Sequence, residues 1–148
     1  MADDLFTPTI APAAYGTRRR PWRPQSLIFP AVFAGPLAAT VLALVNGHRL
    51  GLPRRTNLMV LGVGLAALTA RLALTLAFLD DWGDRPVRLI AALAGAGVWL
   101  AASATQKRPF RAYELRGDEP ASLWLPGLGA VLLFGVVEAL LFLLVAAG

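Results

Sequence analysis

Two ionisable residues lie deep inside apolar segments of the sequence, where a charge is costly. Arg71 is the single charged residue within residues 58–79, and Glu138 is the single charged residue within residues 123–147. A charged side chain at the centre of a bilayer costs at least about 2.5–3.5 kcal/mol, so each residue needs compensation. Arginine and a carboxylate form charge-assisted, bidentate hydrogen bonds with each other. Such an intramembrane pair can fix the register of helices or couple to the movement of an ion.

The depths of the two residues predict that they meet. Arg71 lies two or three residues beyond the middle of its apolar run, and Glu138 lies about three beyond the middle of its own. In helices that cross the membrane in the same direction, both lie roughly 4–5 Å from the midplane in one leaflet. We therefore predict an intramembrane Arg71–Glu138 ion pair, with either a register-setting role or a role in proton or cation movement. In the alternative, the two never meet and Arg71 extends toward Asp80 and Asp81.

The segments that carry these residues predict an all-α integral membrane bundle of four transmembrane helices. Of the 148 residues, 57% are hydrophobic, and the mean hydropathy is +0.61, which is unusual for a soluble domain. About 20 apolar residues span a bilayer core as a helix. The predicted spans are residues 27–46, 58–79, 87–105 and 123–147. They form one domain, residues 26–148, after a polar, non-helical tail, residues 1–25, that is rich in proline and arginine.

Proline and tryptophan mark irregularities and edges in these runs. Gly35 and Pro36 interrupt the first run and Pro126 lies near the start of the last, so we predict helix kinks at these positions. Tryptophan is enriched where a helix meets the membrane surface. The predicted interfacial anchors, each at the edge of an apolar run, are Trp22, Trp82 and Trp124.

Small residues repeat along the third run, which predicts close helix packing. Ala91 and Gly95 are four residues apart, as are Gly97 and Ala101, and such spacings let helix backbones approach closely in membranes. The run is also only modestly hydrophobic. We therefore expect this helix to be central and packed between at least two others.

The basic residues do not orient a four-span bundle. Four spans place six on the side of the tail and the second connection, and seven on the other side, so the positive-inside rule gives no decision. Insertion in both orientations as an antiparallel dimer, or orientation by a partner, would explain this balance. A first run that is re-entrant at Gly35–Pro36 would instead place eleven on the tail's side. Because nineteen apolar residues span without difficulty, we predict four true spans with the aspartate-bearing second connection outside.

The composition excludes several classes of function. The chain has no cysteine and one histidine, so thiol chemistry and metal sites built on several histidines within one chain are ruled out. No nucleotide-binding, metalloprotease or Ser/His/Asp motif is present. The arginines flank apolar runs, as in membrane proteins, and therefore do not indicate nucleic-acid binding. We predict no enzymatic activity, no cofactor and no bound metal.

A short segment resembles one found in small prokaryotic four-span membrane proteins. It consists of Gly35-Pro36-Leu37-Ala38, then Asn46, then Leu50-Gly51. The family has no assigned activity. The resemblance therefore implies a prokaryotic membrane location and nothing about chemistry.

Two functions are consistent with these features. The first is a non-enzymatic accessory or scaffold subunit of a larger assembly, expected in the bacterial inner membrane, with the lipid bilayer and other membrane subunits or a second copy as partners. The second is a small transporter or channel, possibly a dual-topology dimer, that uses Arg71 and Glu138. An enzyme that acts on lipid ranks third, because no nucleophile–base pair is visible.

Overall fold

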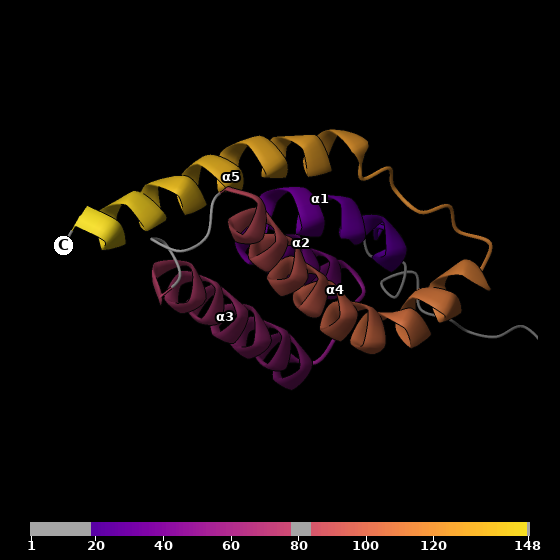
Figure 1. The fold of residues 1–148 in the computed structure, drawn as a ribbon. Coiled ribbons are helices and arrows are strands. Elements are labelled where there is room, and N and C mark those ends of the chain that lie inside the picture. Colours follow the sequence, from indigo (N-terminus) through magenta and orange to yellow (C-terminus); the bar gives the residue numbers. More distant parts are fainter. Residues whose placement is uncertain (1–18, 78–83, 148) are drawn as a thin grey trace, which may run out of the picture.

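The described part of the chain is helical. The computed structural model describes residues 19–77 and 84–147, and within them the single strand-like feature is an isolated bridge between Trp22 and Ala121. The elements are the short 3-10 helix η3 (Pro24–Leu27), α1 (Ile28–Ala34), α2 (Pro36–Arg49), α3 (Arg54–Ala77), α4 (Asp84–Glu114) and α5 (Trp124–Ala147) (Figure 1). Of these, α3, α4 and α5 are long and apolar enough to cross a membrane. The prediction of an all-α fold is thus confirmed for these residues, and the three long apolar helices are consistent with an integral membrane protein.

The first apolar run does not form the predicted continuous span. It breaks at Gly35, where φ is 84° and ψ is −166°, into the short α1 and the longer α2. The backbone N–H of Trp22 donates to Asn46 Oδ1 at 2.7 Å, and Asn46 Nδ2 donates to the Trp22 carbonyl at 3.1 Å. Residues on opposite sides of the break therefore meet at the far end from Gly35. The two helices form an antiparallel hairpin, and Figure 1 shows α1 lying beside α2.

The sequence around the break explains why the helix turns back. Pro36 has no backbone N–H and its ring clashes with the preceding helical turn, so it begins α2 instead of continuing α1. Gly35 adopts a backbone conformation open essentially to glycine alone. Alanines on the inner faces, namely Ala31, Ala34, Ala38, Ala39 and Ala43, are fully buried. The inner faces of the hairpin are thus covered by protein, as the backbone of a re-entrant segment requires, while Phe29 and Phe33 on the outer face of α1 are exposed.

Each long helix turns one stripe toward this hairpin. On α3 the stripe holds Val60, Gly64 and Thr75, and on α4 it holds Val98 and Ala102. Val60 and Gly64 are four residues apart, as are Val98 and Ala102, and Thr75 lies three turns beyond Gly64, so each set lies on one face of its helix. The opposite faces carry large exposed apolar side chains, as expected where a helix meets lipid.

The helix that contains the third apolar run, α4, is longer than the predicted span. It was expected to end at Thr105 and be followed by a polar connection, but α4 continues to Glu114 with Pro109 inside it. Two buried side chains hold the extension against the protein: Gln106 is fully buried and Phe110 nearly so. Tertiary packing therefore overrides the helix-breaking tendency of Pro109.

The predicted kink at Pro126 is absent, since α5 runs as a single helix from Trp124 to Ala147. Pro126 lies in the first turn of α5. Backbone N–H groups in a first turn have no partner within the helix, so proline is tolerated there without a bend. Of the irregularities predicted in α1, α2 and α5, the break at Gly35 and Pro36 is present and the kink at Pro126 is not.

The predicted packing of α4 is partly confirmed. This helix packs against α1, α2 and α3, and a Cβ on Gly95 would clash with the Ala31 carbonyl oxygen. Ala91 and Ala101 are half-buried. Gly97 was also predicted to pack, but it is exposed and has open space around it. Small residues fill every face of this alanine-rich helix, so their spacing does not identify the packed face.

Substitution of Gly95 by leucine should destabilise the protein, whereas Gly97→Leu should not. A side chain at residue 95 would displace the backbone of α1, and overpacking of this kind costs about 1–3 kcal/mol. The two variants differ by two positions on one helix, so they match in hydrophobicity and depth. Unfolding by SDS titration in mixed micelles measures the difference. Equal stabilities would show that α1 and α4 do not pack closely at Gly95.

Candidate functional site

The tip of the hairpin joins three helices through the two intramembrane charges. Glu138 on α5 forms an ion pair with Arg71 on α3. The other carboxylate oxygen, Oε1, accepts a hydrogen bond of 2.7 Å from the backbone N–H of Leu37. Glu138 is 3% exposed, and the Arg71 side chain is 20% exposed. The structure thus brings together the two residues whose depths predict a pair, and it adds α2 as a third participant.

The beginning of α2 is a favourable place for a carboxylate. The first N–H groups of a helix lack partners within it, and the helix dipole places partial positive charge there. Pro36 is the first residue of α2 and has no N–H, so Leu37 supplies the first available donor. Glu138 therefore lies between the electropositive end of α2 and the guanidinium of Arg71.

Gly35 provides the space in which this contact forms. A Cβ at this position would lie 2.6 Å from both Arg71 Nη1 and Glu138 Oε2. The residue is thus needed twice, for its backbone conformation and for its missing side chain. The sequence predicts a kink at Gly35 but not its proximity to the ion pair. The first apolar run contains no acidic residue, so its own sequence gives no sign that an ion pair lies beside Gly35.

A buried amide network closes the other end of the hairpin. Asn46 Nδ2 donates to Gln106 Oε1 at 2.8 Å, and Gln106 Nε2 donates to the Ala43 carbonyl at 2.7 Å. Asn46 also exchanges two hydrogen bonds with the backbone of Trp22. Both amides are completely buried. We call Trp22, Ala43, Asn46 and Gln106 the hairpin base, and Gly35 to Leu37 with Arg71 and Glu138 the hairpin tip.

Sequence reasoning missed the hairpin base. The predicted spans end at Asn46 and at Thr105, so Asn46 is there the last residue of a span and Gln106 lies just outside one. The available signal is that both amides stand at the ends of apolar runs. Inside a membrane protein such groups require hydrogen-bond partners, because lipid offers none.

Trp22 belongs to the protein interior and is not an interfacial anchor as predicted. It is 3% exposed, and the Arg49 guanidinium lies 3.8 Å from the centre of its ring, a favourable cation–π contact. Burial, and then the charge of Arg19, lower the pKa of Arg49 from its ordinary value. Trp124, at 78% exposure, stays a predicted anchor, and Trp82 lies outside the described residues.

A hairpin in place of the first span puts most of the basic residues on one side of the membrane. If α1 and α2 enter and leave on the same side, eleven of the fourteen basic residues lie on the side of the hairpin base. They are Arg18, Arg19, Arg20, Arg23, Arg49, Arg54, Arg55, Lys107, Arg108, Arg111 and Arg116. Arg85 and Arg88 lie on the other side. The positive-inside rule then favours a cytoplasmic hairpin base.

The two termini should therefore lie on opposite sides of the membrane. Four true spans would return both termini to one side, whereas a hairpin with α3, α4 and α5 separates them. Alkaline phosphatase is active only outside the cytoplasm, so it should be active when fused after Gly148 and inactive when fused before Met1. A cytoplasm-specific fluorescent reporter should give the reverse pattern. Activity of the same reporter at both termini would restore the four-span arrangement.

Comparisons of the chain with known proteins identify no family. Models of protein families, characterised protein sequences and solved structures gave no significant match. Within residues 19–77 and 84–147, no group of three or more His, Asp or Glu side chains is arranged to hold a metal ion. What the protein does must be inferred from the hairpin, its tip and its base.

Proposed function

We propose that the protein is a non-enzymatic accessory or scaffold subunit of a larger assembly in the bacterial inner membrane. The observation that carries this proposal is that the polar groups at the tip and base of the hairpin are satisfied by one another. Glu138 is held by Arg71 and the Leu37 N–H, and Asn46 is held by Trp22 and Gln106. Such groups fix the positions of helices rather than offer themselves to a substrate.

The outer surface of α5 supports a role in assembly. This helix packs mainly on α1 and α2, as Figure 1 shows. Its remaining faces carry exposed apolar side chains along its length: Leu125, Leu132, Leu133, Val136, Leu140, Leu143 and Leu144. Lipid satisfies such a surface, and so does a neighbouring transmembrane helix. A rigid hairpin beneath α5 would present this surface in a constant position to a neighbouring subunit.

Photo-crosslinking in native membranes tests the assembly role. A photoreactive amino acid at Leu140 on α5 should give a discrete protein adduct, and the same probe at Leu65, similarly exposed on α3, serves as the matched control. Gentle purification should then yield a heteromeric complex of fixed stoichiometry that contains the cross-linked partner. A single unattached chain, with adducts to lipid alone at both positions, would contradict the proposal.

A small transporter or channel is the second candidate, and the broken first run favours it. Secondary transporters place substrate sites near the midplane, where the ends of half-helices face ionic groups. The α2 N-terminus facing Glu138 has this arrangement. Thr75, one turn beyond Arg71, is buried, and its hydroxyl has no hydrogen-bond partner among the described residues. The uneven distribution of basic residues around a hairpin supports one orientation over a dual-topology dimer.

Reconstituted vesicles separate this candidate from the first. Protein-dependent proton or cation flux that Glu138→Gln abolishes would establish transport by the purified chain. A lack of flux in vesicles, together with a fixed heteromeric complex in membranes, would favour the accessory subunit.

A further inference from the structure

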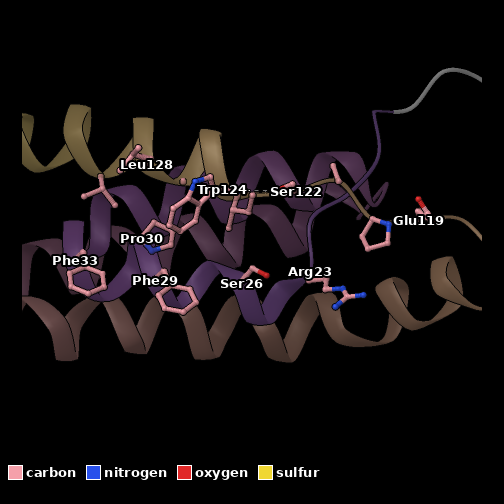
Figure 2. Close-up of a pocket in the computed structure, with 14 residues that line it drawn as sticks. Arg23, Ser26, Phe29, Pro30, Phe33, Glu119, Ser122, Trp124 and Leu128 are labelled. Carbon is pink, nitrogen blue, oxygen red and sulfur yellow. Dashed lines mark hydrogen bonds between the residues drawn. The ribbon is translucent and has the colours of Figure 1, made fainter.

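A groove of about 980 Å³ lies between α1 and the beginning of α5. Its volume is at the upper end of the roughly 300–1,000 Å³ typical of small-molecule sites. One wall is the outer face of α1 and the other is the first two turns of α5 (Figure 2). Neither the hairpin tip nor the hairpin base contributes to it, so the groove is separate from the polar contacts described above.

The lining of the groove changes from apolar to polar along its length. Figure 2 shows Phe33 and Leu128 at one end, and Arg23 and Glu119 at the other. Phe29 and Trp124 line the middle. Phe29, Phe33, Trp124 and Leu128 are exposed, with Phe33 at 73%. A molecule that is itself apolar at one end and charged at the other would match this gradient.

The length of the groove is close to the thickness of one leaflet. Its α1 wall ends at Ala34, immediately before the hairpin tip. The four residues of η3 and the seven of α1 together rise by roughly 18 Å, a little over half of a hydrocarbon core of roughly 30 Å. A transmembrane helix of another protein would need a matching surface through both leaflets. A single phospholipid occupies one leaflet only.

We propose that this groove binds one zwitterionic aminophospholipid from the leaflet on the side of the hairpin base. An acyl chain lies between Phe29 and Phe33 on α1 and Trp124 on α5. At the polar end, Arg23 contacts the phosphate and Glu119 contacts the ammonium group of a phosphoethanolamine headgroup. Charge complementarity selects this headgroup, because an anionic lipid would meet Glu119 with no cation to offer. The site is independent of whether the protein is a subunit or a transporter.

Native mass spectrometry of the detergent-solubilised full chain measures lipid binding directly. Phosphatidylethanolamine, phosphatidylglycerol and phosphatidylcholine with identical acyl chains are titrated separately. Phosphatidylethanolamine should bind about three- to tenfold more tightly than the other two, which is about the net contribution of one ordinary hydrogen bond. Equal binding of the three lipids, or tighter binding of phosphatidylglycerol, would overturn the headgroup assignment.

Variants at exposed positions separate the contributions of the headgroup and the chain. Arg23→Gln should weaken all three lipids because they share the phosphate, and Glu119→Gln should remove only the preference for phosphatidylethanolamine. Arg116→Gln and Glu114→Gln change the same charges outside the groove and should alter neither. Leu128→Trp, which narrows the apolar end of the groove, should weaken every lipid.

Two results would refute the lipid site itself. Unchanged binding in the Leu128→Trp variant would show that lipid binds elsewhere on the protein. A photoreactive probe at Phe33 that cross-links to another protein, and not to lipid, would assign the groove to a protein partner.

Discussion

Replacing Gly35 with alanine is expected to lower the free energy of unfolding by at least about 3 kcal/mol. Two costs combine: a non-glycine residue in this backbone conformation costs roughly 1–3 kcal/mol, and the new methyl group displaces the ion pair. The Cβ would lie 2.6 Å from Arg71 Nη1 and 2.6 Å from Glu138 Oε2. Breaking a buried pair costs about 3–5 kcal/mol. Unfolding of the purified chain by SDS titration measures the total.

Gly117→Ala is the matched control for this prediction. Gly117 also has a positive φ, 81° against 84° for Gly35, but a Cβ there meets nothing within 4 Å. This control therefore includes the backbone cost, about 1–2 kcal/mol for a left-handed residue, without the clash. If the two variants lose equal stability, Gly35 is required for its backbone conformation alone, and the close approach of the ion pair is wrong.

The long helices could be predicted from sequence because their signal is continuous. The apolar runs at residues 58–79 and 123–147, which form most of α3 and α5, are each more than twenty residues long and carry one charge, and no soluble alternative competes with that pattern. The Arg71–Glu138 contact followed from depth alone, since the two helices run in the same direction and each charge must find a partner. Helix length and a fixed rise per residue thus place residues along the membrane normal.

The sequence does not decide between a hairpin and a single span, because the length and hydropathy of the first apolar run suit both structures. Nineteen apolar residues either cross a bilayer once or enter and return. Two signals favoured the return: the Gly35–Pro36 break and the uneven basic residues that result from it. Whether the run forms a span or a hairpin depends on contacts between distant segments. These contacts are the packing of Ala31 against Gly95 and of Thr40 against Gly64. Those contacts join segments more than twenty residues apart.

The contacts between neighbouring helices are the features that the sequence predicts least well. Hydropathy reports depth in the membrane but not which face of a helix packs, so Gly95 and Gly97 look equivalent when only Gly95 is buried. The same limit concealed the hairpin base, where Asn46 and Gln106 are 60 residues apart. Polar residues at the ends of apolar runs are informative only once the neighbouring helices are known.

The last prediction separates the charge of the tip pair from its hydrogen bonds. Arg71→Leu leaves a buried carboxylate without its cation, and Glu138→Gln leaves a buried guanidinium without its anion. Each should cost about 3–5 kcal/mol. The double variant Arg71→Leu with Glu138→Gln removes both charges and keeps an amide oxygen to accept from the Leu37 N–H. It should therefore be more stable than either single variant, by about 2 kcal/mol or more, in the SDS titration.

A second double variant shows what the α2 N-terminus contributes. Arg71→Leu with Glu138→Leu also removes both charges, but it leaves the Leu37 N–H without an acceptor, at a cost of roughly 1–3 kcal/mol. Its free energy of unfolding should be lower than that of the glutamine-containing double variant by that amount. If the two double variants are equally stable, the hydrogen bond to Leu37 does not hold the tip. If neither exceeds the single variants, Arg71 and Glu138 do not form a coupled pair.

If the glutamine-containing variant folds and keeps its cross-link at Leu140, the pair sets helix register; if it folds but loses ion flux, the pair carries transport.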